Sequence, residues 1–162
     1  MKLSDSLNNA FNEQIVHEYR NQLIYTQLES IFEDFQLKNI AKYFHEQSLQ
    51  EKGHGDKIVE HLNNRTGGKV NIMEINFPKI SDYTIDTLSD IGNLYISTEE
   101  STTESIESIF EFALQNRSYI DLPLLSDMLQ EQVEEEDSAN EFALNIKMTK
   151  DLVLFDKSFE GG

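Results

Sequence analysis

Four long segments of this chain repeat apolar residues every three or four positions, which is the spacing of one face of an α-helix. They lie at about residues 4–34, 37–64, 82–116 and 121–146. Only 2 prolines and 7 glycines occur among 162 residues, so little interrupts these helices. Amphipathic helices bury their apolar faces against one another. The sequence therefore predicts an all-α bundle, and its length suits one domain, residues 1–162.

The connections between these helices predict how they are ordered. Short links join the first helix to the second and the third to the fourth, whereas residues 66–81, with strand-like residues 69–72, form a long connection. Short links make antiparallel neighbours, and the long one can cross the whole length of a bundle. The fourth helix should begin at Asp121, a plausible N-cap, with Pro123 in its first turn. A short apolar segment, residues 152–155, ends the chain.

Charge and composition argue against several classes of function. The formal net charge of −17 disfavours nucleic-acid binding, where a basic patch is expected, and is compatible with cations as ligands or substrates. No apolar run approaches the ~20 residues of a membrane-spanning helix, and the first residues do not resemble a secretory signal. The chain has no cysteine, hence no disulfide and no thiolate metal site. We therefore expect a cytoplasmic protein that binds neither nucleic acid nor membrane.

The apolar residues of each predicted helix form a stripe along one face. Polar residues interrupt each apolar stripe near its middle, and one of them on each helix is acidic. These acidic residues are Glu18, Glu51, Glu99 and Glu135. Other residues that the stripes place inward are Gln14, Asn21, Gln47, Ile85, Thr102 and Leu129. Buried carboxylates without a basic partner are costly, so the arrangement makes sense if cations lie among them. On the third helix Glu100 competes with Glu99, and the stripe favours Glu99 because it falls one turn after Tyr95.

Two pairs of side chains have the spacing with which one helix holds a metal ion. Glu51 and His54 are three residues apart, so both lie on one helical face. Gln132 and Glu135 repeat this spacing on the fourth helix. Oxygen ligands with one imidazole suit Fe²⁺ or Mn²⁺ better than a structural Zn²⁺ site. The sequence therefore predicts a metal site inside the bundle.

The remaining candidates have simpler interpretations. Tyr25 lies two turns after Glu18 on the same stripe, where core packing explains it equally well. Of the other histidines, His17 is expected at the edge of a stripe, His45 in solvent and His61 near a helix end.

Together these motifs resemble those of the bacterial non-haem ferritins. The resemblance rests on Asn12-Glu13-Gln14 with Glu18, on Glu51-x-x-His54, on residues 131–136 and on residues 152–157. It covers nearly the whole chain. It implies a ferritin-like antiparallel four-helix bundle, with a long crossover between helices two and three and a short fifth helix. It also implies an iron-storing homo-oligomeric shell of 24 subunits.

The resemblance further implies a ferroxidase centre, in which two iron ions inside each subunit are oxidised from Fe²⁺ by O₂ or H₂O₂. The implied ligands of the first iron are Glu18, Glu51 and His54. Those of the second iron are Glu51, Glu99 and Glu135, with Gln132 nearby. Tyr25 would lie beside the centre and supply an electron. A third iron position is implied at Gln50, Glu131 and Glu134, although bacterial members usually have an acid where this chain has Gln50.

Related classes differ from this chain at particular residues. Bacterioferritins and rubrerythrins have a second Glu-x-x-His on the fourth helix, whereas the residue three after Glu131 is Glu134. Bacterioferritins bind haem through a methionine where this chain has Lys52, so we expect no haem. Rubrerythrins need cysteine-bound iron, and this chain has no cysteine. Two alternatives stay open, a shell that buffers metal without catalysis and a DNA-protecting mini-ferritin, and the acidic charge disfavours the second.

Overall fold

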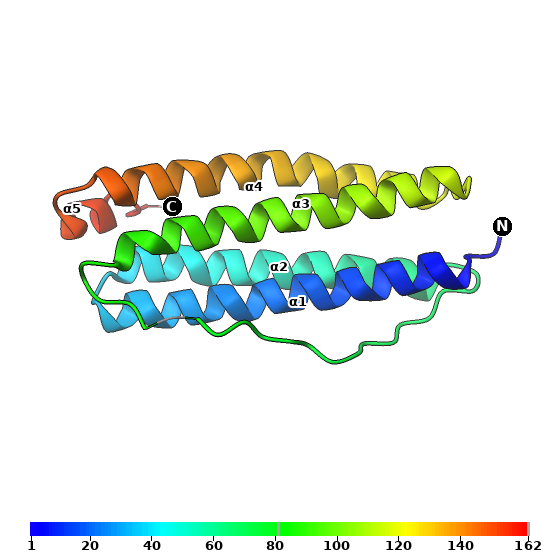
Figure 1. Cartoon of the computed structure of the whole chain (residues 1–162), viewed down its shortest axis with the longest axis horizontal. Helices are drawn as coiled ribbons and strands as arrows, with labels where there is room; N and C mark the ends of the chain where they lie inside the picture. The colour runs from blue at the N-terminus through cyan, green and yellow to red at the C-terminus, as the bar shows by residue number, and fades with distance from the viewer. Residues whose placement is uncertain (81, 162) are drawn as a thin grey trace.

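The computed structural model describes residues 1–80 and 82–161, and its helices follow one another in the predicted order (Figure 1). The four long helices are α1 (Asp5–Asp34), α2 (Lys38–Asn64), α3 (Ile91–Gln115) and α4 (Leu122–Met148). A 3₁₀ turn, η1 (Leu88–Asp90), precedes α3, and the short α5 (Leu152–Lys157) follows α4. α1 packs along α2, and α3 along α4. None of the described helices is long and apolar enough to cross a membrane.

The connection between α2 and α3 runs beside α1 from one end of the bundle to the other (Figure 1). Asn12 Nδ2 donates to the carbonyl of Lys69 at 2.8 Å, and Asn12 Oδ1 accepts from the N–H of Asn71 at 2.6 Å. Asn8 Oδ1 accepts from the N–H of Lys69 at 2.7 Å. Side chains of α1 thus take the hydrogen bonds that a partner strand would supply. Residues 69–72, strand-like in sequence, belong to the non-helical connection as expected and have no strand partner among the described residues.

The predicted start of the third helix near residue 82 is wrong. Helical structure begins with η1, and α3 itself begins at Ile91. The N–H of Thr84 donates to Thr87 Oγ1 at 2.9 Å, which is the kind of local side-chain bond that competes with a helix. Ile85, predicted to point inward, is consequently 58% exposed. Ser81, the predicted end of the connection, lies outside the described residues.

Three smaller expectations also need correction. Leu129 on α4 was predicted to point inward, but it is half-buried, and its neighbour Met128 is buried instead. Gln47 on α2 is half-buried, and it accepts from the Tyr95 hydroxyl at 3.0 Å. α4 does begin directly after Asp121, but this carboxylate does not cap it. The side chains that donate to Asp121 instead are His61, Arg65 and Ser118.

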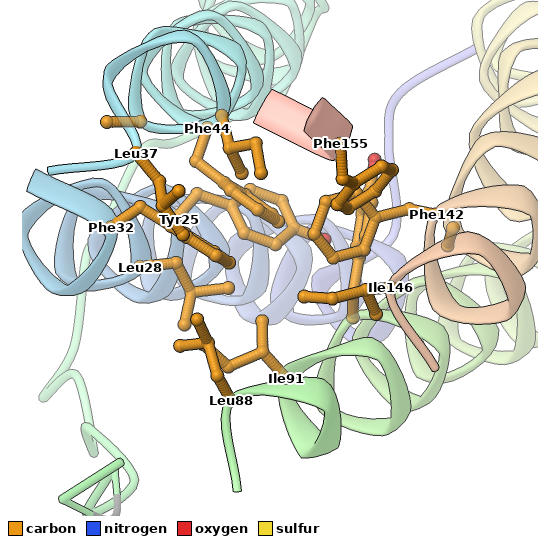
Figure 2. Packing of buried hydrophobic residues seen from close by; sticks show 14 of the residues in the cluster. Tyr25, Leu28, Phe32, Leu37, Phe44, Leu88, Ile91, Phe142, Ile146 and Phe155 are labelled. Atoms are coloured by element: carbon orange, nitrogen blue, oxygen red, sulfur yellow. The ribbon is translucent and has the colours of Figure 1, made fainter. Parts of the chain in front are cut away.

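The apolar core is divided into two clusters that flank the middle of the bundle. One contains Phe32, Phe44 and Phe142, with Phe155 from α5 packed on it (Figure 2). The members of the other include Phe11, Ile58, Ile106 and Leu125. Between the clusters the inward positions of all four helices are polar. The two clusters therefore pack the four helices together on either side of a polar middle layer.

The C-terminal helix is attached to the bundle through Asp156. Its carboxylate accepts from the backbone N–H groups of Asn39 and Ile40, and from the Asn39 amide, each at 2.9 Å. These backbone groups belong to the first turn of α2, where no intrahelical acceptor exists. Leu37, the residue before α2, offers no side-chain cap. A residue from the other end of the chain thus caps α2, and its negative charge suits a helix N-terminus.

We expect Asp156→Ala to lower the free energy of unfolding by about 1–2 kcal/mol, because the first turn of α2 loses its cap. The melting temperature, measured by circular dichroism at neutral pH, should fall by several degrees, at about 2–4 °C per kcal/mol. Asp137→Ala, at an exposed position of α4, is the control and should change the free energy by at most about 0.5 kcal/mol. Equal melting of Asp156→Ala and the parent would contradict this role.

Candidate metal centre

The four acidic residues predicted to face inward all lie in the polar middle layer. They come one from each long helix and are Glu18, Glu51, Glu99 and Glu135. None exposes more than 8% of its surface. Glu100, the competitor of Glu99, is exposed. The helical stripes therefore bring four carboxylates together between the apolar clusters.

Two groups of side chains are close enough for each to hold one metal ion. In the first, ligand atoms of Glu18, Glu51 and His54 lie within 4.8 Å of one another. In the second, the same holds for Glu51, Glu99 and Glu135. His54 Nδ1 lies 3.5 Å from Glu51 Oε1 and 3.9 Å from Glu18 Oε2. Glu51 belongs to both groups, so its carboxylate can bridge two ions.

The protein itself leaves the negative charge of this cluster largely uncompensated. Within residues 1–80 and 82–161, the ion pairs recorded for the four carboxylates involve only His54. Glu18 Oε2 and Glu135 Oε2 are buried and have no hydrogen-bond partner among the described residues. Such unsatisfied buried atoms cost about 1–3 kcal/mol each. A bound cation would satisfy both, so the residues present fit a metal site.

Burial and mutual repulsion make these carboxyl groups weak acids. Burial first, and then the neighbouring carboxylate of Glu51, raises the pKa of Glu18 well above its usual range. Burial, followed by repulsion from Glu99 and Glu135, does the same to the pKa of Glu51. Burial also raises the pKa of Glu99, and it raises that of Glu135 to about 7. The metal-free cluster therefore holds protons that a divalent cation would displace.

Neutral side chains hold the carboxylates in place. The Tyr25 hydroxyl donates to Glu99 Oε1, and Gln132 Nε2 donates to Glu99 Oε2 at 3.2 Å. Gln14 Nε2 donates to Glu18 Oε1 at 2.7 Å. Burial, with the Glu99 carboxylate next in importance, raises the pKa of Tyr25, so the phenol keeps its proton. In this structure Gln132 presents its amide nitrogen, a donor, to the cluster.

A cavity of about 450 Å³ lies on the His54 side of the cluster. The residues implied to hold a third iron all line this cavity, and they are Gln50, Glu131 and Glu134. Glu131 Oε2 lies 2.9 Å from His54 Nε2, and Glu131 Oε1 lies 2.8 Å from Lys57 Nζ. The pairing of Glu131 with Lys57 was not predicted from the sequence. A third metal at this place stays a prediction.

Sequence reasoning missed a polar network between α1 and α3. His17, read as an edge residue, contacts Thr102 Oγ1, which in turn contacts Asn21 beside Glu51. Burial, together with nearby Arg20, lowers the pKa of His17 to about 4, so the ring is neutral. The signal was present, because Asn21 and Thr102 both lie on inward stripes, where a polar side chain needs a partner. His45 is exposed as expected.

This fold and this cluster define the ferritin-like class of four-helix bundles, whose metal sites are built inside the bundle from glutamates and Glu-x-x-His pairs. The family model described as ferritin-like domain matches residues 8–149. A bacterial non-heme ferritin of Staphylococcus aureus is 31% identical over 135 residues, 83% of this chain and 78% of the relative. The chain belongs to the ferritin family, as its motifs indicated.

Two further comparisons agree with this assignment. Ferritin-2, chloroplastic, of Arabidopsis thaliana is 30% identical over 155 residues, which is 90% of this chain and 59% of the plant protein. The crystal structure of an open pore ferritin from Archaeoglobus fulgidus superposes with a TM-score of 0.91, over 99% of both chains at 23% identity. The archaeal structure shows that the fold is shared.

We expect Glu51→Gln to raise the melting temperature of the metal-free protein at neutral pH. The pKa of Glu51 is higher in the folded than in the unfolded chain, so the unfolded chain releases its proton first as pH rises. The parent therefore loses stability above about pH 4.3, at about 1.4 kcal/mol for each unit by which the pKa is raised. The glutamine cannot ionise and avoids this loss.

Melting curves in the presence of chelator, near pH 5 and near pH 7.5, measure this effect. The advantage of Glu51→Gln over the parent should be larger at the higher pH, since more of the penalty has developed there. Glu100→Gln, at an exposed position, is the control and should melt like the parent. A Glu51→Gln protein that melts below the parent at neutral pH would show that structural hydrogen bonds, rather than metal ligation, explain the buried carboxylate.

Proposed function

We propose that this chain is an iron-storage ferritin whose subunit oxidises Fe²⁺ at two metal positions inside the bundle. Its family and fold support iron storage. The ferroxidase part is carried by one observation, that Glu51 belongs to two buried ligand groups. Two ions that share a carboxylate can lie ~3.5–4 Å apart, which lets both give electrons to one oxidant.

In this proposal Fe²⁺ is the substrate, and the side chains provide its positions. The first ion is held by Glu18, Glu51 and His54, and the second by Glu51, Glu99 and Glu135. Cation binding displaces the protons that burial keeps on these groups in the metal-free protein.

Each Fe²⁺ gives one electron to the oxidant. O₂ takes two electrons and two protons to become H₂O₂, or H₂O₂ takes two electrons and two protons to become two waters. Where only one Fe²⁺ is bound, Tyr25, which is buried and hydrogen-bonded to Glu99, is placed to supply the second of these two electrons while its phenolic proton passes to the Glu99 carboxylate.

We also propose assembly into a closed homo-oligomeric shell of 24 subunits that receives the ferric product. Family membership supports this, and so do large apolar side chains left exposed on the single subunit. Those exposed most along the crossover and the C-terminal end of the chain include Met73, Met148, Val153 and Leu154. The strongly acidic composition favours retention of cations inside such a shell.

We expect Glu99→Gln to slow Fe²⁺ oxidation under O₂ at least tenfold, because one ligand of the second ion loses its charge. Loss of a metal-site interaction commonly costs about 10–100-fold. Glu100→Gln makes the same substitution one residue away, on the exposed face of α3, and should keep the parent rate. Stopped-flow absorbance of the ferric product measures both. A parent protein that binds Fe²⁺ without accelerating its oxidation would instead support the metal-buffering shell.

A crystal soaked anaerobically in Fe²⁺ checks the geometry of the same proposal. Two ions should lie inside each subunit, ~3.5–4 Å apart and bridged by Glu51. Metal found only between subunits would contradict an intrasubunit centre.

Deletion of residues 150–162 should leave the shell assembled, because the surfaces of the long helices offer most of the area for contacts. The truncated protein should melt at a lower temperature, since α2 loses the cap from Asp156. Light scattering after size-exclusion chromatography measures the assembly. A purely monomeric product would show that the tail is an assembly determinant.

A further inference from the structure

Asn21 lies inside the bundle, 1% exposed, beside the shared carboxylate. Its Nδ2 donates to Glu51 Oε2 at 3.0 Å and to Thr102 Oγ1 at 2.8 Å. Its own Oδ1 is buried and has no partner among the described residues. This orientation of the amide group leaves its oxygen unsatisfied, which is costly. A neighbouring side chain must therefore favour it over the alternative in which Nδ2 and Oδ1 exchange places.

Thr102 is that neighbour. Its hydroxyl donates to the carbonyl of Thr98 at 2.9 Å, so the other contacts of Thr102 Oγ1 must be with donors. One is His17 Nε2 at 2.9 Å, and the other is the Asn21 amide. A reversed amide would bring two acceptor oxygens together at the distance of a hydrogen bond. The Asn21 nitrogen is therefore fixed toward Thr102 and Glu51.

The direction of the His17 contact is fixed as well. Arg20 Nη2 lies 3.3 Å from His17 Nδ1, and a guanidinium can only donate. Nδ1 is therefore the acceptor, and the ring hydrogen lies on Nε2, where it is donated to Thr102. A chain of hydrogen bonds therefore runs from Arg20, at the half-buried edge of α1, through His17, Thr102 and Asn21 to Glu51. Each bond in this chain has only one possible direction.

This network determines how Glu51 is held. Glu51 Oε2 accepts from Asn21, while Glu51 Oε1 lies 3.5 Å from His54 Nδ1. The hydrogen bond from Asn21 thus restrains the carboxylate at Oε2, and each oxygen keeps a lone pair for a metal ion. Hydrogen-bond partners behind a ligand commonly set its orientation and so the affinity of the site.

We propose that Asn21 and Thr102 are positioning residues, which hold the Glu51 carboxylate in the plane that reaches both metal positions. His17 and Arg20 fix the direction of the hydrogen bonds that they make. This inference rests on the proposed function, because Glu51 is the ligand that both positions share.

The test is an anaerobic titration with Co²⁺, whose visible absorption reports its coordination and which is not turned over. Asn21→Leu and Thr102→Val should each weaken Co²⁺ binding by about 10–100-fold. The double variant should bind no more weakly than Asn21→Leu alone, since both act through one hydrogen bond. Thr98→Val is the matched control one turn away. Its hydroxyl donates to the Leu94 carbonyl of its own helix and, among residues 1–80 and 82–161, has no recorded bond to the cluster, so its Co²⁺ affinity should equal the parent's.

A second pair of variants separates positioning from packing. Thr102→Ser and Thr102→Ala both lose the methyl group, and only the serine variant keeps the hydroxyl. Thr102→Ser should bind Co²⁺ like the parent, and Thr102→Ala should bind it at least tenfold more weakly. Equal weakening in both would show that Thr102 acts through packing, and the inference would be wrong.

Glu51→Gln distinguishes the two levels of the proposal. If it abolishes Co²⁺ binding while the Asn21 and Thr102 variants bind like the parent, the positioning role is refuted and the proposed function stands. If Glu51→Gln binds Co²⁺ like the parent, the metal centre itself is refuted, and the positioning role with it.

Discussion

The repulsion among four buried carboxylates is the interaction on which the rest of this structure depends. Glu18, Glu51, Glu99 and Glu135 share one water-poor layer without a lysine or arginine partner among the described residues. The aromatic cluster around Phe44 packs the helices together on one side of this layer (Figure 2). The cluster that includes Phe11 and Ile58 packs them together on the other side, so the carboxylates stay buried between the two. Strain of this kind is commonly retained where function requires it.

The side chains that donate hydrogen bonds to the four carboxylates share one chemical property, which is that they carry no charge. Gln14, Tyr25, Asn21 and Gln132 each direct a donor at a carboxylate oxygen. Neutral donors orient an oxygen and leave its negative charge for a metal ion, whereas an ammonium or guanidinium would compete with that ion. Lys57, which lines the cavity beside the cluster, binds Glu131 rather than any of the four carboxylates.

Contacts between residues far apart in sequence also complete the ends of the helices. Asp156 caps α2 from the opposite end of the chain, and Asp121 bonds to Arg65 and His61 at the end of α2 rather than to its own helix. The Asp156 carboxylate satisfies backbone donors that the first turn of α2 leaves unpaired, and the Asp121 carboxylate accepts from side chains at the other end of α2. The bundle is thus closed at both ends by polar contacts, while its length is held by apolar ones.

The sequence by itself determined the four helices, their order and the inward placement of Glu18, Glu51, Glu99 and Glu135, because helical periodicity is a local property that can be read along the chain. It misplaced the start of α3, where threonine side chains close a turn, and it passed over His17. The direction of the hydrogen bond from Asn21 to Glu51 was decided only by the tertiary structure. That direction depends on Thr102, 81 residues away, and on what its hydroxyl already bonds. Periodicity shows which face of a helix a residue occupies, whereas its role as hydrogen-bond donor or acceptor is set by the residues that the tertiary structure places beside it.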